Sequence, residues 1–384
     1  MTLAHATAWG LAGFWWLYAL RGVRDVLAVP ELPPLSPTEA ELTAARPVSV
    51  VIAARDEAAR LEGTVRRLLA QQDVDVEVIV VDDRSTDDTG VIGERLARED
   101  PRVRCVRVAT LPGDWLGKPH ACQRGAELAR HPWVLFTDAD TWMEEDVLAR
   151  ALAAAEREHA QHVTLAPGIR DVTWLGEAVM CGFKLNLLPL MASANRDGKL
   201  GAIGVGAFNL IQRDTWHAIG GHTRLAMEVV DDLRLGTLLR RGGFRTRAYV
   251  AERDVVVEWA HDVTGIVRAI EKNTFANLRY SVAIASAVVI GTLALFGGAL
   301  TGPVWASGLS GWAAFIGLFA MAIPAAMLAR RTGTPMSPAV ASPISAPVLA
   351  WAVANSTWKT LRRGGVIWRG TLFPLQRLRE RRVR

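Results

Sequence analysis

Short β-branched runs alternate with helical stretches in the first part of this 384-residue chain. The first runs cover Val48 to Ala54, Val76 to Val81 and Val103 to Val108. Apolar residues at helical spacing lie between them, and a further apolar run, Trp133-Val134-Leu135, closes the series. Strands and helices in alternation favour a mainly parallel, doubly wound sheet with flanking helices. The sequence therefore predicts an α/β domain over residues 47–265.

Acidic residues follow two of these predicted strands at the point where each strand ends. Asp82 and Asp83 end the second strand, and Asp138 and Asp140 follow the fourth. Ligands bind at the carboxyl ends of the strands in such sheets, so we expect these side chains to lie close together. Two carboxylates spaced i, i+2 can reach one divalent cation, and hard oxygen ligands suit Mg²⁺ or Mn²⁺. Solvated acids in a βα loop are the alternative for this spacing.

Later parts of the predicted domain hold further candidates for a site. The stretch from Gly201 to Gly206 is glycine-rich, which permits close backbone approach to a ligand, or else marks a mobile loop. Asp231 and Asp232 open a predicted helix, where the helix dipole also favours acids, so a capping role stays open. His222 and His261 have either a structural role or a contact with phosphate or acceptor.

Two long stretches in the C-terminal part hold no charged residue, Ser281 to Ala329 and Thr332 to Trp358. The segments Ser281 to Leu300 and about Trp305 to Ala329 are long enough to be transmembrane helices. Three prolines interrupt the segment Met336 to Trp358, namely Pro338, Pro343 and Pro347. We expect that segment to be re-entrant or interfacial, with a full span as the alternative.

Both ends of the chain also indicate a membrane. Leu3 to Leu20 is apolar and rich in Trp, and Arg21 and Arg24 follow it. A cleaved signal peptide has the opposite order of charge and apolar run, so we expect an uncleaved anchor over residues 1–28 with its basic side cytoplasmic, or else an interfacial helix. The tail, Lys359 to Arg384, holds nine Lys and Arg and one acid, which indicates anionic lipid headgroups rather than nucleic acid.

The resulting division has six parts. They are an anchor (1–28), a Pro-rich connector (29–46), the α/β domain (47–265), an interfacial linker (266–280), transmembrane or re-entrant helices (281–358) and a basic cytoplasmic tail (359–384). Inside the α/β domain, Trp174 to Met191 is apolar except for Glu177 and Lys184, so it is expected to be too polar for a span and either buried or at the membrane surface. The three cysteines show no CxxC or zinc spacing, which favours a reducing compartment.

Six motifs occur in the order seen in family 2 glycosyltransferases of the GT-A fold, and the chain resembles that family over about Pro47 to Trp259. The motifs are Val48 to Glu57, Val81 to Thr89, Gly117-Lys118-Pro119, Asp138-Ala139-Asp140, Gly220-Gly221-His222 and Val230-Asp231-Asp232-Leu233. The resemblance implies a Rossmann-like GT-A catalytic domain. The C-terminal spans, Glu271 to Ala276 and Gly364 to Gly370 further resemble a membrane-bound subgroup with carotenoid- and hopanoid-associated members.

The resemblance also implies roles for individual residues. The uracil and ribose of a nucleotide sugar would be held by Ala53, Arg55, Glu57, Asp82 and Asp83. Lys118 and His222 would lie near the nucleotide sugar, and Asp138 would contact the ribose. Asp138 and Asp140 would bind Mg²⁺ or Mn²⁺ on the diphosphate. Asp232 would be the catalytic base, with Asp231 in place of the usual Glu.

Together these features predict an inverting glycosyltransferase that uses a UDP-sugar and a membrane lipid acceptor. Its catalytic domain would face the cytoplasm from a multi-pass position in a bacterial cytoplasmic membrane. The Gln-x-x-Arg-Trp motif of processive synthases is missing after Trp259, where Arg268, Lys272 and Asn273 stand instead. A polysaccharide or cell-envelope glycan synthase, a nucleotidyltransferase and a non-catalytic membrane scaffold are the alternatives.

Overall fold

The computed structural model of the chain describes residues 2–44, 46–198 and 201–383. Met1, Ala45 and Arg384, which fall in the predicted anchor, connector and tail, lie outside the described residues. The chain divides into two compact units. The sheet unit comprises Val29–Arg170, Leu190–Glu258 and Glu380–Arg384, and the helical unit comprises Met1–Ala28, Asp171–Pro189 and Trp259–Arg379.

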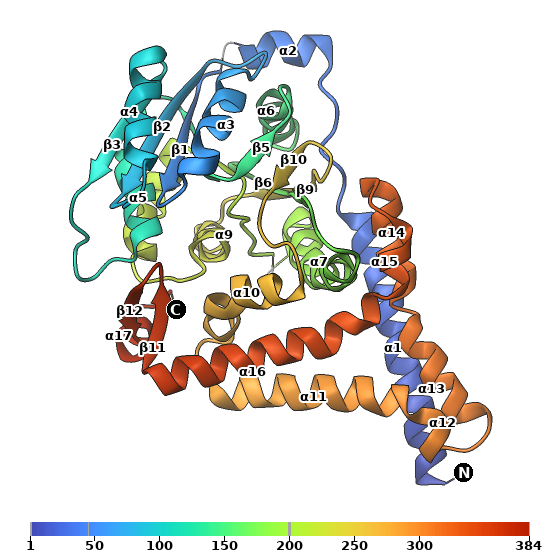
Figure 1. Cartoon of the computed structure of the whole chain (residues 1–384). Helices are drawn as coiled ribbons and strands as arrows, with labels where there is room; N and C mark the ends of the chain where they lie inside the picture. The colour runs from blue at the N-terminus through green and yellow to red at the C-terminus, as the bar shows by residue number, and fades with distance from the viewer. Residues whose placement is uncertain (1, 45, 199–200, 384) are drawn as a thin grey trace. The chain divides into compact units, whose positions relative to one another are not determined.

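A seven-stranded sheet with the order β3-β2-β1-β4-β8-β6-β9 forms the centre of the sheet unit (Figure 1). Its strands are β1 (Val48–Ala54), β2 (Val76–Asp83), β3 (Val103–Val108), β4 (Trp133–Asp138), β6 (His162–Ala166), β8 (Asn209–Gln212) and β9 (Thr246–Val250). Only β8 runs antiparallel to its neighbours, β4 and β6. The predicted, mainly parallel sheet is therefore confirmed. A smaller sheet has the order β5 (Thr141–Met143), β10 (Val255–Val257), β7 (Gly168–Ile169).

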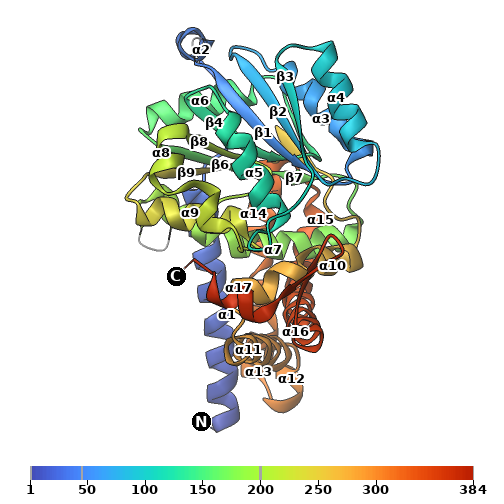
Figure 2. The ribbon, with the colours of Figure 1, turned by 90° about the vertical axis from the view of Figure 1, so that its left-hand side faces the viewer.

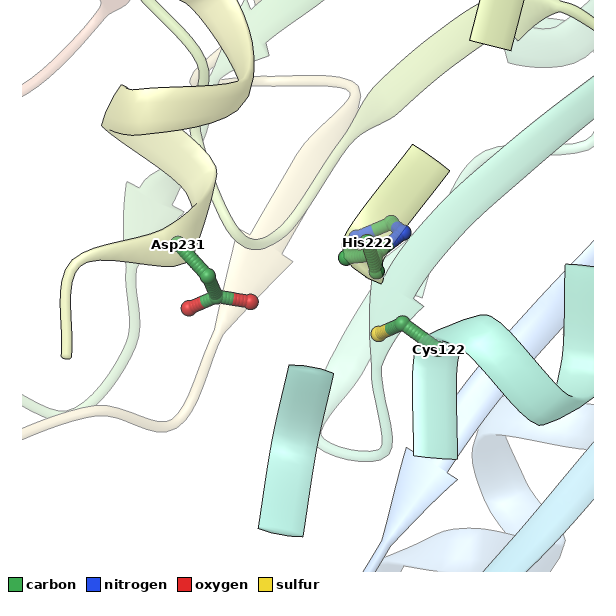
Figure 3. A group of neighbouring side chains, drawn as sticks. All are labelled: Cys122, His222 and Asp231. Atoms are coloured by element: carbon green, nitrogen blue, oxygen red, sulfur yellow. The ribbon is translucent and has the colours of Figure 1, made fainter. Parts of the chain in front are cut away.

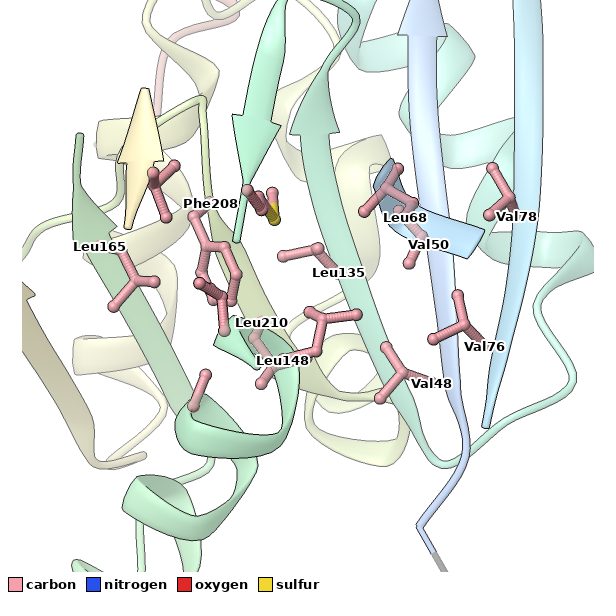
Figure 4. Close-up of a cluster of buried hydrophobic side chains, with 14 of the residues drawn as sticks. Val48, Val50, Leu68, Val76, Val78, Leu135, Leu148, Leu165, Phe208 and Leu210 are labelled. Carbon is pink, nitrogen blue, oxygen red and sulfur yellow. The ribbon is translucent and has the colours of Figure 1, made fainter. Parts of the chain in front are cut away.

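Helices cover both faces of the large sheet because its strands are apolar on both sides. Val50 and Ile52 of β1 pack on one face and Val51 on the other, as the two-residue period of a strand requires. The first face is covered by α3 (Ala58–Leu69), α4 (Thr89–Glu99) and α6 (Val147–Arg157), and Figure 4 shows part of that core. The second face is covered by α5 (Gly117–Leu128), α8 (Arg213–Ala218) and α9 (Asp231–Arg241), with α5 visible across the strands in Figure 2. A short helix, α2 (Pro37–Ala44), precedes β1.

The register of the central strands brings the predicted site residues to one edge. Ala54 of β1 pairs with Asp82 of β2, and Ala53 pairs with Asp138 of β4. Because these three strands are parallel, their carboxyl ends and the loops that follow them meet at the same edge of the sheet. The predicted site residues therefore lie at the ends of strands that are mostly buried.

The helical unit consists mainly of long helices and a hairpin. Its elements are α1 (Leu3–Ala28), most of α7 (Trp174–Asn195), α10 (Val263–Asn277), α11 (Val282–Leu300), α12 (Gly302–Trp305), α13 (Leu309–Phe319), α14 (Ala322–Thr332), α15 (Met336–Val340), α16 (Ser345–Arg363), β11 (Gly365–Trp368), β12 (Thr371–Pro374) and α17 (Leu375–Glu380). Helix α1 packs against α13 and α14, and α16 packs against α10 and α11. The predicted linker 266–280 is mostly helix α10, and the predicted boundary at residue 265 falls inside that helix.

Within the described residues, three helical segments are long and apolar enough to cross a membrane. They are α7, α11 and the segment Leu309–Thr332 that contains α13 and α14, with mean hydropathies of 1.3, 2.1 and 2.0. Helix α7 is apolar enough by composition, so the expectation that its sequence is too polar for a span is wrong in that respect. Its most apolar 18 residues are nevertheless 61% buried inside the protein. Neither α1 nor α16 is among the three.

Candidate active site

The loops after β1 and β2 are joined by hydrogen bonds at the carboxyl edge of the sheet. The backbone N–H of Asp56 donates to Ser85 Oγ (3.1 Å), and that of Glu57 donates to Thr89 Oγ1 (2.8 Å). Asp56 adopts a φ of 55°, a conformation that Asp tolerates better than most residues. Among the described residues, Nε of Arg55 is buried without a hydrogen-bond partner. The loop thus holds a donor that a bound ligand can satisfy.

Asp82 and Asp83 are buried where β2 ends. Asp82 is 1% exposed and accepts a hydrogen bond from the backbone N–H of Ser85 (3.0 Å). Asp83 is 4% exposed and makes a two-pronged ion pair with Arg84 (2.8 and 2.9 Å). These contacts brace the loop, and the predicted contacts of the two carboxylates with uracil and ribose stay a prediction.

The loop that follows β4 carries Asp138 and Asp140. Thr64 Oγ1 donates to the carbonyl of Ala139 (2.7 Å), which fixes the residue between the two acids. Burial, together with the negative charges of Asp138 and Glu57, raises the pKa of Asp140 to about 7. Two carboxylates that repel each other can bind a divalent cation between them, and Mg²⁺ and Mn²⁺ prefer carboxylate oxygens as ligands. The donor set therefore suits the predicted metal.

Lys118, in the first turn of α5, pairs with the first of these acids. Its Nζ lies 2.5 Å from Asp138 Oδ1. Burial alone lowers the pKa of Lys118, but the charges of Asp138, Asp231 and Asp232 outweigh it and hold that pKa well above its usual value. The lysine is therefore a positive charge that three aspartates stabilise, and it forms an ion pair with one of them, Asp138.

Gly206 is the point at which the predicted metal ligand, the lysine and the predicted base converge. A side-chain Cβ at Gly206 would lie 2.9 Å from Asp138 Oδ2, 3.2 Å from Lys118 Nζ and 3.3 Å from Asp232 Oδ2. The backbone N–H of Gly206 donates to Asp232 Oδ2 (3.0 Å), and the N–H of Leu233 donates to Asp232 Oδ1 (2.7 Å). The Asp232 carboxylate, the predicted base, is thus held by two backbone donors and faces a space that only glycine leaves open.

A buried histidine that the sequence did not single out supports this glycine segment. His162 contacts Asn209 Oδ1 and Thr246 Oγ1 at 3.2 Å each, and burial lowers its pKa to about 4. Asn209 Nδ2 donates to the carbonyl of Val205 (2.7 Å), the residue before Gly206. The neutral imidazole therefore orients the amide that fixes the glycine segment. In the sequence, the one sign of this network is that the polar residues His162 and Asn209 stand beside apolar residues in short segments.

The two acids of α9 take different positions. Asp231 is 6% exposed and turns inward, where its carboxylate, the Cys122 thiol and the His222 ring point toward one another (Figure 3). One ligand atom from each of the three lies within 4.8 Å of the others. Asp232 instead faces Gly206. The structure therefore separates the predicted pair into an inner and an outer acid.

In this inner cluster the histidine ring has no free nitrogen lone pair to offer to a metal. Trp216 Nε1 donates to His222 Nδ1 (3.0 Å), so the neutral ring carries its proton on Nε2 and offers no nitrogen lone pair. Burial, together with the charge of Lys118, lowers the pKa of His222 to about 3, and burial raises the pKa of the Cys122 thiol. His222 is 2% exposed beneath the site, so its predicted substrate contact stays a prediction.

Replacing Gly206 by Ala should impair turnover without unfolding the protein. Its φ lies outside the left-handed region, so the backbone accepts Ala, but the methyl group enters the space shared by Asp138, Lys118 and Asp232. We expect kcat/KM to fall roughly 10- to 100-fold, because displacements near 1 Å cost that much in an oriented site. Gly113→Ala is the matched control, since its Cβ would meet no atom within 4 Å. Equal activity of the two variants would contradict the crowding argument.

Comparisons with known proteins bear on the family and the fold of the chain. Residues 49–216 match the model of the family described as glycosyl transferase family 2. Curated relatives in Staphylococcus aureus strains, including USA300 and NCTC 8325, bear the name 4,4'-diaponeurosporenoate glycosyltransferase. They are 27% identical over 193 residues, which are 50% of this chain and 50% of the relative. The chain thus spans about half the length of the curated relatives it matches.

A solved structure extends the likeness of fold to most of the chain. It is the mannosyltransferase PcManGT from Pyrobaculum calidifontis in complex with GDP-Man and Mn²⁺. The two proteins superpose with a TM-score of 0.55 at 21% sequence identity, and the match covers 92% of this chain and 99% of the other. At that identity the comparison describes the fold alone.

Proposed function

Because residues 49–216 are a family 2 glycosyltransferase domain with the GT-A fold, we propose that this protein transfers a sugar from a nucleoside-diphosphate sugar to a lipid acceptor at a membrane. The observation that carries the proposal is the convergence of Asp138, Lys118 and Asp232 around Gly206. It supplies an acidic group for a cation, a fixed positive charge and a general base to one small space. A non-catalytic scaffold has no need of that arrangement.

The reaction is a single in-line displacement with inversion at the anomeric carbon. An acceptor hydroxyl attacks that carbon while Asp232 takes the hydroxyl proton as general base. The bond from the anomeric carbon to the diphosphate oxygen breaks, and the nucleoside diphosphate leaves with the bonding electrons. The hydrogen bonds from Gly206 and Leu233 hold the Asp232 carboxylate in place for this step.

Asp138 and Asp140 would hold Mg²⁺ or Mn²⁺, which offsets negative charge on the leaving diphosphate when bound. Lys118 adds a positive charge to the same region and binds the diphosphate oxygens. The protein itself thus contributes two carboxylate ligands, at the end of β4 and just after it, and the ammonium group of Lys118 at the start of α5.

We propose a UDP-sugar as donor, held by the loop from Ala53 to Glu57 with its buried Arg55 Nε, and by Asp82 and Asp83. The acceptor is proposed to be lipid-like. Two observations support that choice: the names of the curated relatives include an apocarotenoid acid, and three helical segments are apolar enough to cross a membrane. The transferase domain would then work at the cytoplasmic face of a multi-pass membrane protein.

The test is incubation of membranes that contain the full chain with radiolabelled UDP-sugars and GDP-mannose. We expect label in the organic phase after lipid extraction, and mass spectrometry of that product identifies sugar and acceptor. Calorimetry should show nucleoside diphosphate binding that weakens at least about tenfold when EDTA removes the metal. Label only in water-soluble products would overturn the lipid acceptor, and nucleotide binding that ignores the metal would overturn the proposed donor site.

A further inference from the structure

Two cavities of the helical unit meet at α10. The first has a volume of about 400 Å³ and lies between α10, the end of α16 and the β11–β12 hairpin. The second has a volume of about 460 Å³ and lies between α10 and α16. Arg268 and Glu271 line both cavities, so the two form one continuous groove. We call this the α10–α16 groove.

The first cavity is strongly basic. Its charged lining residues are four bases and one acid, namely Arg268, Lys272, Arg363, Arg369 and Glu271. The acid is already neutralised, because Glu271 contacts Lys359 Nζ at 2.5 Å and Arg363 Nη1 at 3.0 Å. Among the described residues, Arg268 has no ion-pair or hydrogen-bond partner. This end of the groove therefore carries positive charge that can attract an anionic group.

The basic end also has a fixed geometry. Lys272 Nζ lies 3.8 Å from the centre of the Trp368 ring on the hairpin, so the hairpin holds the ammonium group by a cation–π contact. Asn355 donates to Glu271 Oε2 (3.3 Å), which ties α16 to α10 along the same wall. The bases come from two helices and a hairpin, and Lys272 among them has a defined contact with the hairpin.

The second cavity is lined by five apolar residues and by five polar or charged ones, which include Arg268, Glu271 and Lys359. Val263 and Val267 of α10 face Val348 and Trp351 of α16 there, and Trp351 is 64% exposed. Helix α16 also packs against α11, a candidate membrane span of which only 11% is buried in the protein. An apolar chain in this cavity would cover side chains that water otherwise contacts. The groove therefore has a basic end for a headgroup and apolar side chains along which an acyl chain can lie.

We propose that the α10–α16 groove binds an anionic membrane phospholipid, with the headgroup phosphate near Arg268, Lys272 and Arg369 and an acyl chain along Val267 and Trp351. Charge complementarity selects an anionic headgroup, and the apolar side chains of the adjoining cavity select a lipid over a soluble phosphate. The site does not depend on the proposed transfer reaction. It makes anionic lipid a structural ligand of the helical unit.

The test compares two lipids with the same acyl chains in binding to the full chain in detergent. The probes are phosphatidylglycerol and phosphatidylcholine, each with a fluorescent label on one chain. Wild type should bind phosphatidylglycerol roughly tenfold or more tightly, as expected for several bases near one anionic headgroup. The double variant R268Q/K272Q should lose that preference. Arg330→Gln is the matched control, because Arg330 at the end of α14 lines neither cavity and should leave the preference unchanged.

A third variant and a soluble competitor separate a lipid site from a simple anion site. Trp351→Ala should weaken phosphatidylglycerol binding several-fold and leave the binding of inorganic phosphate unchanged. Equal binding of the two lipids by wild type, or a preserved preference in R268Q/K272Q, would overturn the proposal. Displacement of the lipid by millimolar phosphate would do the same. Nucleotide binding with Mn²⁺, measured on each preparation, reports folding and tests the proposed function separately.

Discussion

Asp232→Asn should reduce turnover by roughly 10²- to 10⁴-fold while nucleotide binding stays within about twofold of wild type. The amide keeps the shape of the carboxylate and can still accept the N–H of Gly206 or Leu233, so the local structure should persist. It cannot take a proton from the acceptor, and that loss appears in kcat. Steady-state kinetics and UDP calorimetry on the same preparation measure the two effects separately.

Asp214→Asn is the matched control for this variant. Asp214 is an exposed acid in the first turn of α8, just as Asp232 lies in the first turn of α9, so both changes remove one charge from a helix start. The control should keep wild-type turnover. If Asp232→Asn retained turnover as well, the base would have to be another group, and the assignment would be wrong.

Asp140→Asn should weaken Mn²⁺ binding by more than about 100-fold, since even groups behind a metal's direct ligands contribute roughly 10- to 100-fold. This change leaves the ion pair between Lys118 and Asp138 intact, so it tests the metal without unpairing the lysine. It also removes the repulsion that raises the pKa of Asp140. The melting temperature without metal should therefore stay the same or rise while metal affinity and activity fall.

Electron paramagnetic resonance of Mn²⁺ measures the affinity directly, without reference to turnover. Asp73→Asn serves as the control, because Asp73 is exposed in the loop before β2, at the opposite edge of the sheet, and its φ of 54° suits Asn. Unchanged Mn²⁺ affinity in Asp140→Asn, with affinity lost only in Asp138→Asn, would leave Asp140 outside the metal site.

The first half of the sheet unit could be predicted from sequence because each element carried its own local signal. Short segments rich in Val and Ile predicted β1 and β2, alternating valines predicted β3, and apolar residues at helical spacing predicted α3. The acids at the ends of β2 and β4 then followed from the rule that parallel strands share an edge. These positions depend on local pattern and topology, which a single sequence contains.

The remaining parts depended on contacts that no local pattern reveals. Strands β6 and β8 are short and carry polar His162 and Asn209, so neither run has a clear strand period. The convergence at Gly206 depends on the antiparallel pairing of β8 with β4, which is a tertiary choice. The different burial of Asp231 and Asp232 likewise follows from the packing of α9 and not from its first-turn sequence.

The reversed direction of β8 has a consequence for how this enzyme could diversify. Because β8 is antiparallel to β4, it begins at the edge of the sheet where β4 ends. The segment before β8 therefore lies beside the loop that follows β4. The loops after β1, β2 and β4 thus form one half of the site, and the Gly206 segment with the start of α9 forms the other. The two halves come from separate stretches of the gene. Substitutions can therefore alter the Gly206 segment and the start of α9 while the loops after β1, β2 and β4 stay unchanged.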